Sequence, residues 1–170
     1  YPMPEALWVP FLDRSAAVIG GMLLTREAPW LDRDSLVAER LAGVDRLVGH
    51  LPMAGYREVF REEFRWDTNW KVLAENFMES YHLPVCHAGT IGGASDLNQM
   101  ECPEGEEAFN YHWIVKNDLV PLALAHPSNT VLQGDDRRIT WLLAIYPALL
   151  ITLTPGYFWY LSLTPDGPGS

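Results

Sequence analysis

Cysteine and basic residues are both scarce in this sequence. Only two cysteines, Cys86 and Cys102, occur among 170 residues, which argues against a disulfide-rich secreted scaffold. We therefore expect reduced thiols and a cytoplasmic location. Lysine and arginine number 12 against 22 acidic residues, so the formal net charge is −10. Because nucleic-acid binding depends on clustered basic side chains, we expect no nucleic-acid partner.

Long uninterrupted apolar runs are missing as well. The most apolar stretch, Trp141 to Pro165, carries no charge, but Pro147, Pro155 and Gly156 divide it into short pieces. A membrane-spanning helix needs about 20 consecutive apolar residues. These pieces instead have the length and the β-branched and aromatic composition of strands. The stretch therefore predicts consecutive antiparallel strands and no membrane span.

The rest of the chain has an ordinary globular composition, with 48% hydrophobic and 20% charged residues. A helix-rich half precedes a strand-rich half, which predicts an α+β fold with an antiparallel sheet. Residues 1–18 contain three prolines and no clear period, so we expect an irregular N-terminal segment at 1–30, in which 17–24 could form a short strand. The expected elements are helices at 34–50 and 69–83, a half-exposed strand at 56–66, a loop at 88–106, and strands at 108–116, 129–133, 138–145, 148–154 and 157–163.

One short stretch, ENFMESYHLPVCH at residues 75–87, combines acids, an amide, two histidines and a cysteine. Glu75, Glu79 and His82 follow one another at spacings of four and three residues, so a helix places them on one face. His87 comes five residues after His82, and on a continuous helix the two would point apart. A helix that ends just before Pro84 would let the chain turn and bring the histidines together.

Two imidazoles and one carboxylate on one face of a metal leave the opposite positions open, an arrangement that suits Fe(II). A zinc protease is not indicated because the H-E-x-x-H spacing does not occur. A carboxylate-bridged di-iron bundle needs a second E-x-x-H helix, whereas Glu79 to His82 is the one match here. The alternative is a histidine pair that serves as a capping or surface feature at a helix end.

The remaining histidines and the cysteine of the stretch predict structural roles. His50, His112 and His126 have no comparable neighbours, and we expect each to hydrogen-bond in the core or to face solvent. Cys86 lies beside His87, but no orienting acid or oxyanion motif accompanies it. We therefore expect a buried structural thiol at Cys86, not a nucleophile.

The run NWKVLAENFMESYHLPVCH at residues 69–87 resembles the signature of the catalytic domain of Rieske non-heme iron oxygenases, the large (alpha) subunit of the ring-hydroxylating type. The later run IYPALLITLTPGYFWYLSLTPDGP resembles the strands of the same domain, and the likeness covers residues 31–170. It implies a helix-grip fold of the START/Bet v1-like kind, with an antiparallel sheet and flanking helices.

The resemblance also implies roles for three residues. His82 and His87 would be ligands of a mononuclear Fe(II). Glu79 would be the bridging acid that links an iron-bound histidine to the Rieske cluster of a neighbouring subunit and carries the electron. This position is usually Asp, and Glu occurs in part of the family, including some enzymes that act on quaternary ammonium compounds.

The sequence departs from the family pattern at two points. The Cys-x-His and Cys-x-x-His pairs of a Rieske site do not occur, so the 2Fe–2S cluster is expected only in the intact protein. The family's third iron ligand is an Asp on a helix that would follow Ser170, although Glu79, Asp96 or Glu101 could substitute as the carboxylate. We therefore expect a partial catalytic domain at 31–170, a linker or Rieske-domain remnant at 1–30, and weak or no iron binding by this piece alone.

The expected activity is dioxygen-dependent hydroxylation, as a monooxygenase or a dioxygenase, of an aromatic or quaternary ammonium substrate. Expected partners are a ferredoxin or reductase as electron donor and two further copies in a homotrimer. One alternative is a hydrophobic-ligand-binding module of the same fold, with Trp113, Trp141, Tyr146 and Trp159 around an apolar pocket, although plain core packing suits these aromatic residues better. The other alternative is an inactive fragment.

Overall fold

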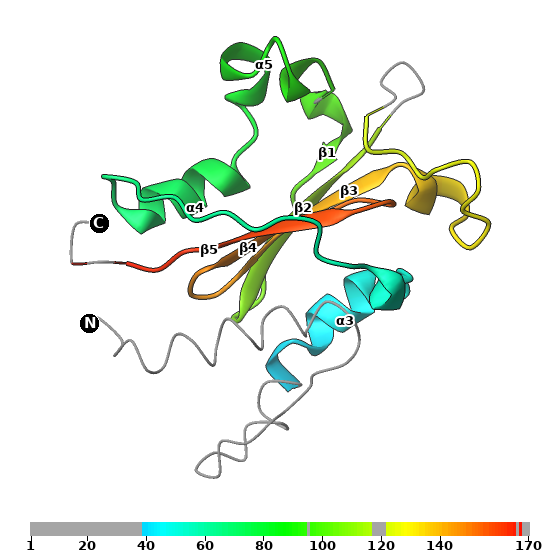
Figure 1. Cartoon of the computed structure of the whole chain (residues 1–170), viewed down its shortest axis with the longest axis horizontal. Coiled ribbons are helices and arrows are strands. Elements are labelled where there is room, and N and C mark those ends of the chain that lie inside the picture. Colours follow the sequence, from blue (N-terminus) through cyan, green and yellow to red (C-terminus); the bar gives the residue numbers. More distant parts are fainter. Residues whose placement is uncertain (1–38, 95, 117–121, 166, 168–170) are drawn as a thin grey trace.

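The computed structural model describes residues 39–94, 96–116, 122–165 and 167. The expectations for residues 1–30, and for the first part of the helix expected at 34–50, lie outside these residues. In the part that is described, helices flank one antiparallel sheet, as in a helix-grip domain (Figure 1). The predicted α+β class is therefore confirmed. No helix among the described residues is long and apolar enough to cross a membrane.

The sheet has five strands in the order β1-β2-β3-β4-β5, and every neighbouring pair is antiparallel. Strands β3, β4 and β5 pair in sequence because short turns, such as the one around Pro155 and Gly156, leave no room for a crossover. Four of the predicted strands are confirmed, as β2 (Phe109–Val115), β3 (Ile139–Ile145), β4 (Leu149–Leu153) and β5 (Phe158–Ser162). The fifth, β1 (Met100–Glu101), is a short edge strand in the segment predicted as a loop.

The apolar core lies between one face of this sheet and helix α3 (Ala42–Val48). Val44 and Val48 of α3 are buried against a cluster that includes Trp141 and the fully buried Ile151. Side chains alternate between the faces of a strand, so this face takes every second residue of β2 to β5. Burial of large aliphatic side chains on this face supplies the main stabilising term of the fold.

Helix α4 (Trp70–Met78) lies on the opposite side of the sheet from α3 (Figure 1). Asn69 caps its start, because the Asn69 side chain accepts a hydrogen bond from the backbone N–H of Lys71 at 3.0 Å. Phe77 of α4 meets Trp159 of β5 edge to face, with ring centroids 5.6 Å apart. This contact holds the end of α4 against the sheet, close to where the polar stretch begins.

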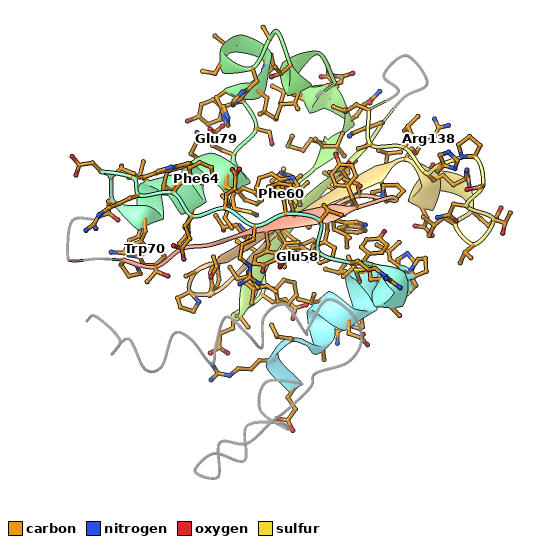
Figure 2. The ribbon with its side chains drawn as sticks, viewed as in Figure 1. Glu58, Phe60, Phe64, Trp70, Glu79 and Arg138 are labelled. Atoms are coloured by element: carbon orange, nitrogen blue, oxygen red, sulfur yellow. The ribbon has the colours of Figure 1, made fainter. Side chains whose placement is uncertain are left out.

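Two predicted strands are wrong. Residues 129–133 form an irregular loop, in which the Asn129 side chain accepts the backbone N–H groups of Val131 and Leu132 at 3.0 and 3.1 Å. Residues 56–66 form no strand with the part of the sheet that is described, and Phe60 and Phe64 are largely exposed (Figure 2). The short 3-10 turns are η1 (Met53–Gly55), η2 (Ile91–Ala94), η3 (Leu97–Gln99) and η4 (Gly134–Arg137).

Candidate metal centre

The polar stretch is divided between two helices and the turn that joins them. Helix α4 ends at Met78, and the backbone of Glu79 is already extended, with φ −101° and ψ 149°. A second, four-residue helix, α5 (Leu83–Cys86), follows (Figure 1). The helix predicted at 69–83 is therefore too long by five residues, and Glu75, Glu79 and His82 do not form a stripe on one helix.

Pro84 has a different role from the one predicted. It lies in the first turn of α5, where a proline is tolerated because its missing N–H would have no helical partner. Pro84 therefore helps to begin α5 and does not end α4. His82 precedes α5 as its N-cap residue and His87 follows it as its C-cap residue. The single helical turn of α5 between the two histidines brings their side chains next to each other.

The two histidines do converge as the sequence predicts. The ring centroids of His82 and His87 are 5.3 Å apart, and their planes are inclined by 65°. Metal–imidazole bonds are about 2.1 Å long, so two imidazoles bound at neighbouring positions of one metal have ring centres roughly 5 Å apart. The pair therefore has a separation that fits a shared metal ion.

The carboxylate of Glu79 holds the turn together (Figure 2). One oxygen, Oε1, lies against Nδ1 of His82 and accepts a hydrogen bond from the Asn76 side-chain amide at 3.1 Å. The other, Oε2, accepts the backbone N–H of His82 at 3.3 Å. A carboxylate on one imidazole nitrogen fixes the ring's tautomer and orientation, as seen around many metal-bound histidines.

Tautomer and burial together decide which nitrogens remain for a metal. Since an ionised carboxylate can only accept, the hydrogen of the His82 imidazole is assigned to Nδ1, which leaves Nε2 with a free lone pair. The side chains of His82 and Glu79 are 16% and 22% exposed. His87 is exposed, so the candidate centre opens to solvent on one side.

A third ligand does not accompany this pair. The described residues contain no group of three or more His, Cys, Asp or Glu side chains placed to hold a metal ion. Asp96 instead caps η3, where its carboxylate accepts the backbone N–H of Asn98 at 2.9 Å. Glu101 lies in the edge strand β1. Neither of these acids completes the centre in this structure.

Sequence reasoning did not single out one buried polar pair beside the centre. Ser80 and His112 are 4% and 3% exposed, and Ser80 Oγ lies 3.4 Å from His112 Nε2. Burial lowers the pKa of His112, because the charged imidazolium is disfavoured away from water. The prediction of a core hydrogen bond for His112 fits this position. Its partner is 32 residues away in sequence, and no local pattern signals that contact.

His50 and His126 bond elsewhere, whereas Cys86 lies in α5 beside the candidate ligand His87. His50 Nε2 lies 3.2 Å from an Asp136 carboxylate oxygen, and His126 Nδ1 lies 2.7 Å from Ser128 Oγ. Cys86 is a free, exposed thiol, so its predicted burial is wrong. The reason is that α5 has no buried residue and places Cys86 on the outside of the turn.

The aromatic residues do not surround one pocket. Trp113 and Trp141 lie 5.1 Å apart, by ring centroids, on the α3 face of the sheet, whereas Trp159 contacts Phe77 on the α4 face. Tyr146 is half exposed in the turn between β3 and β4. An open hollow of about 600 Å³ is lined by residues of β1, β2 and η4 and includes neither candidate histidine ligand. The aromatic residues of the sheet therefore serve packing, as the sequence favours.

Comparison with known proteins places these features in context. Residues 53–170 match the family described as Ring hydroxylating alpha subunit (catalytic domain). The chain is 30% identical over 97 residues to a choline monooxygenase, chloroplastic, of Arabidopsis thaliana. That alignment covers 54% of this chain and 21% of the plant protein, so the chain spans only about a fifth of its relative's length. No solved structure matches the chain.

Proposed function

Because the chain belongs to the ring-hydroxylating alpha-subunit family, as part of its catalytic domain, we propose that it forms the iron-binding part of an oxygenase. The intact protein would hydroxylate an organic substrate with dioxygen. The fold agrees with this assignment, since helices flank an antiparallel sheet and the candidate centre lies where α4 passes into α5.

The observation that carries the proposal is the convergence of His82 and His87 with Glu79 on the far nitrogen of His82. A capping or surface histidine has no need of a second imidazole beside it and a half-buried carboxylate behind it. Together the three side chains provide two imidazole donors, one of them oriented by a carboxylate, and such a donor set suits Fe(II).

Each residue has a proposed task. His82 and His87 would hold the iron, which supplies the activation of dioxygen when bound. Glu79 would fix the His82 ring and stand on the path by which an electron arrives from a Rieske cluster. Since the Cys-x-His and Cys-x-x-His pairs do not occur in these 170 residues, that cluster would lie outside them, in a neighbouring copy of the intact protein.

Substrate and partners belong to the same proposal. The relative named choline monooxygenase, together with Glu at the bridging position, supports a quaternary ammonium substrate, and the family description supports an aromatic one. We propose a ferredoxin or reductase as the electron donor, a homotrimer as the assembly and the cytoplasm as the location.

The test uses the full-length protein with His82→Ala, His87→Ala and, as a matched control, His126→Ala. Total iron is measured together with acid-labile sulfide, which counts cluster iron, so that the mononuclear iron is the difference. We expect each ligand variant to lose most of its mononuclear iron and its oxygen-dependent product, because one imidazole cannot hold the ion alone. The His126 side chain bonds to Ser128 in an exposed loop, and its replacement by Ala should change neither quantity.

The opposite result is equally clear. If the His82→Ala protein keeps its mononuclear iron and its turnover, the metal-ligand assignment is wrong. Ligand binding without any iron in the wild-type protein would instead favour a binding module of the same fold.

A further inference from the structure

A buried polar pair lies between the sheet and the turn that carries the candidate centre. Ser80 and His112 are both nearly inaccessible to solvent, and they are hydrogen-bonded at 3.4 Å, Ser80 Oγ to His112 Nε2. Which atom donates depends on the imidazole tautomer. Burying two polar side chains is costly unless they satisfy each other, so the contact is a specific one.

The turn has few other attachments. Between residues 70 and 91, Ser80 is the only residue that is buried. Helix α5 has no buried residue, and Tyr81 and Val85 are 74% and 80% exposed. The backbone of α5 packs against η2, where a Cβ at Gly92 would come within 2.2 Å of the Leu83 carbonyl oxygen. Helix α5 and η2 therefore pack on each other at the surface, and Ser80 connects this segment to the sheet.

Ser80 is also part of the turn's own hydrogen bonding. It follows Glu79 directly, and its carbonyl accepts the N–H of Leu83 at 3.1 Å, where α5 begins. The Glu79 carboxylate closes the same turn by accepting the backbone N–H of His82. A shift of Ser80 would therefore move the carboxylate and the imidazole together.

We infer that His112 is a positioning residue for the candidate metal centre: through its hydrogen bond to Ser80 it fixes the turn of Glu79 to His82 on the sheet. His112 is carried by β2, which is paired along its whole length with β3, so its backbone position is well determined. The metal part of this inference rests on the proposed function. The ordering of the turn stands on the contacts alone.

The first experiment measures amide hydrogen exchange in the 170-residue chain. Its reporters are the amides of His82 and Leu83, which bond within the turn, and the amide of Ile151 in β4 reports on global opening. We expect Ser80→Ala and His112→Leu to accelerate exchange at the reporters by about tenfold or more, with Ile151 unchanged. His112→Gln, whose amide nitrogen reaches the place of Nε2, should restore slow exchange.

The second experiment titrates the iron-free full-length protein with Fe(II) alone. Ser80→Ala and His112→Leu should weaken Fe(II) binding by about 10- to 100-fold, and His112→Gln should recover most of the affinity. The control is His126→Leu, which removes another Ser–His pair of the described residues, an exposed one with a 2.7 Å contact to Ser128. It should leave both the reporters and the affinity unchanged.

The outcomes distinguish the positioning role of His112 from the proposed iron-binding function. Unchanged reporter exchange and unchanged Fe(II) affinity in Ser80→Ala would overturn the inference, and that variant leaves the sheet intact even if His112→Leu fails to fold. Equal loss of affinity in His112→Gln and His112→Leu would also count against it. If the wild-type protein binds no mononuclear iron but the reporters still respond, the proposed function fails while the positioning of the turn stands.

Discussion

Glu79 accepts two hydrogen bonds with a single carboxylate and lies against a third nitrogen, Nδ1 of His82. Its Oε1 meets His82 Nδ1 and the Asn76 amide, and its Oε2 accepts the His82 backbone N–H. Because each carboxylate oxygen faces an N–H group, both the negative charge and the second acceptor oxygen of Glu79 are needed. A buried or half-buried carboxylate with this many donors is held in one rotamer, and it holds the imidazole in turn.

Replacement of Glu79 by Gln tests whether the charge and the second acceptor oxygen are needed. Glutamine offers one acceptor oxygen, so its NH2 group would face either the Asn76 amide and His82 Nδ1 or the His82 backbone N–H. We expect Fe(II) affinity or turnover of the full-length protein to fall by about 10- to 100-fold. Glu75→Gln, an exposed acid one turn earlier on α4, is the matched control. A Glu79→Gln protein within about twofold of wild type would show that the charge is unnecessary.

His112 gives the chain a pH dependence with a defined sign. Burial lowers the pKa of folded His112 below its ordinary value of 6.5. Between the folded pKa and 6.5, the unfolded chain therefore binds more protons than the folded chain. The free energy of unfolding consequently falls as the pH falls from 6.5 through the folded pKa. His112→Gln removes this contribution. Urea unfolding between pH 5 and pH 7 should therefore give a steeper decline for wild type and for His126→Gln than for His112→Gln. Parallel curves for all three would contradict the lowered pKa.

At the scale of elements, the division of the polar stretch into α4, a turn and α5 is what brings the histidines together. A continuous helix through residue 83 would point His82 and His87 apart. The hydrogen bond between Ser80 and His112, and the carboxylate of Glu79 on the His82 N–H, both favour the extended backbone at Glu79. The turn is therefore a product of tertiary contacts as well as of local sequence.

The start of α4 is determined more locally, and this makes it testable by itself. Asn69 accepts the Lys71 N–H at 3.0 Å, so Asn69→Ala leaves a helix donor without its cap. We expect the free energy of unfolding to fall by about 0.5–2 kcal/mol, and Asn69→Asp, which keeps an acceptor oxygen, to stay close to wild type. Denaturant unfolding followed by circular dichroism measures both. Equal stability of the Ala and Asp variants would show that the cap contributes nothing.

Sequence alone located the elements whose signals are local. The strands between residues 138 and 163 were found to within a residue or two, because prolines and glycine separate runs of β-branched and aromatic residues. The convergence of His82 and His87 was also predicted, although Pro84 was given the wrong task. The end of α4 and the role of His112 could not be predicted, since both depend on a contact between residues 32 positions apart.

At the scale of the whole molecule, the two faces of the sheet differ in character. The α3 face is apolar and includes the buried Trp141, Ile151 and Leu153. The face toward α4 carries His112 and Thr140, and the buried Thr140 hydroxyl has no hydrogen-bond partner. The α3 face therefore carries most of the buried apolar side chains, while the face toward α4 combines buried Ile114, Ala144 and Leu150 with these polar groups.

The match to the family begins at residue 53, yet the fold described here begins earlier. Helix α3 lies before the matched residues and still contributes Val44 and Val48 to the core. The catalytic-domain core in this chain therefore includes structure outside the matched range. This agrees with a domain that begins near residue 31, which stays a prediction.

The central claim is that His82 and His87 bind one mononuclear iron, and nitric oxide tests it most directly. Nitric oxide gives mononuclear ferrous iron a characteristic high-spin EPR signal, and a Rieske cluster does not contribute to it. In the full-length protein reduced under anaerobic conditions, the account predicts this signal in wild type and in His126→Ala, and its loss in His82→Ala and His87→Ala. A signal of equal intensity in all four proteins would contradict the account.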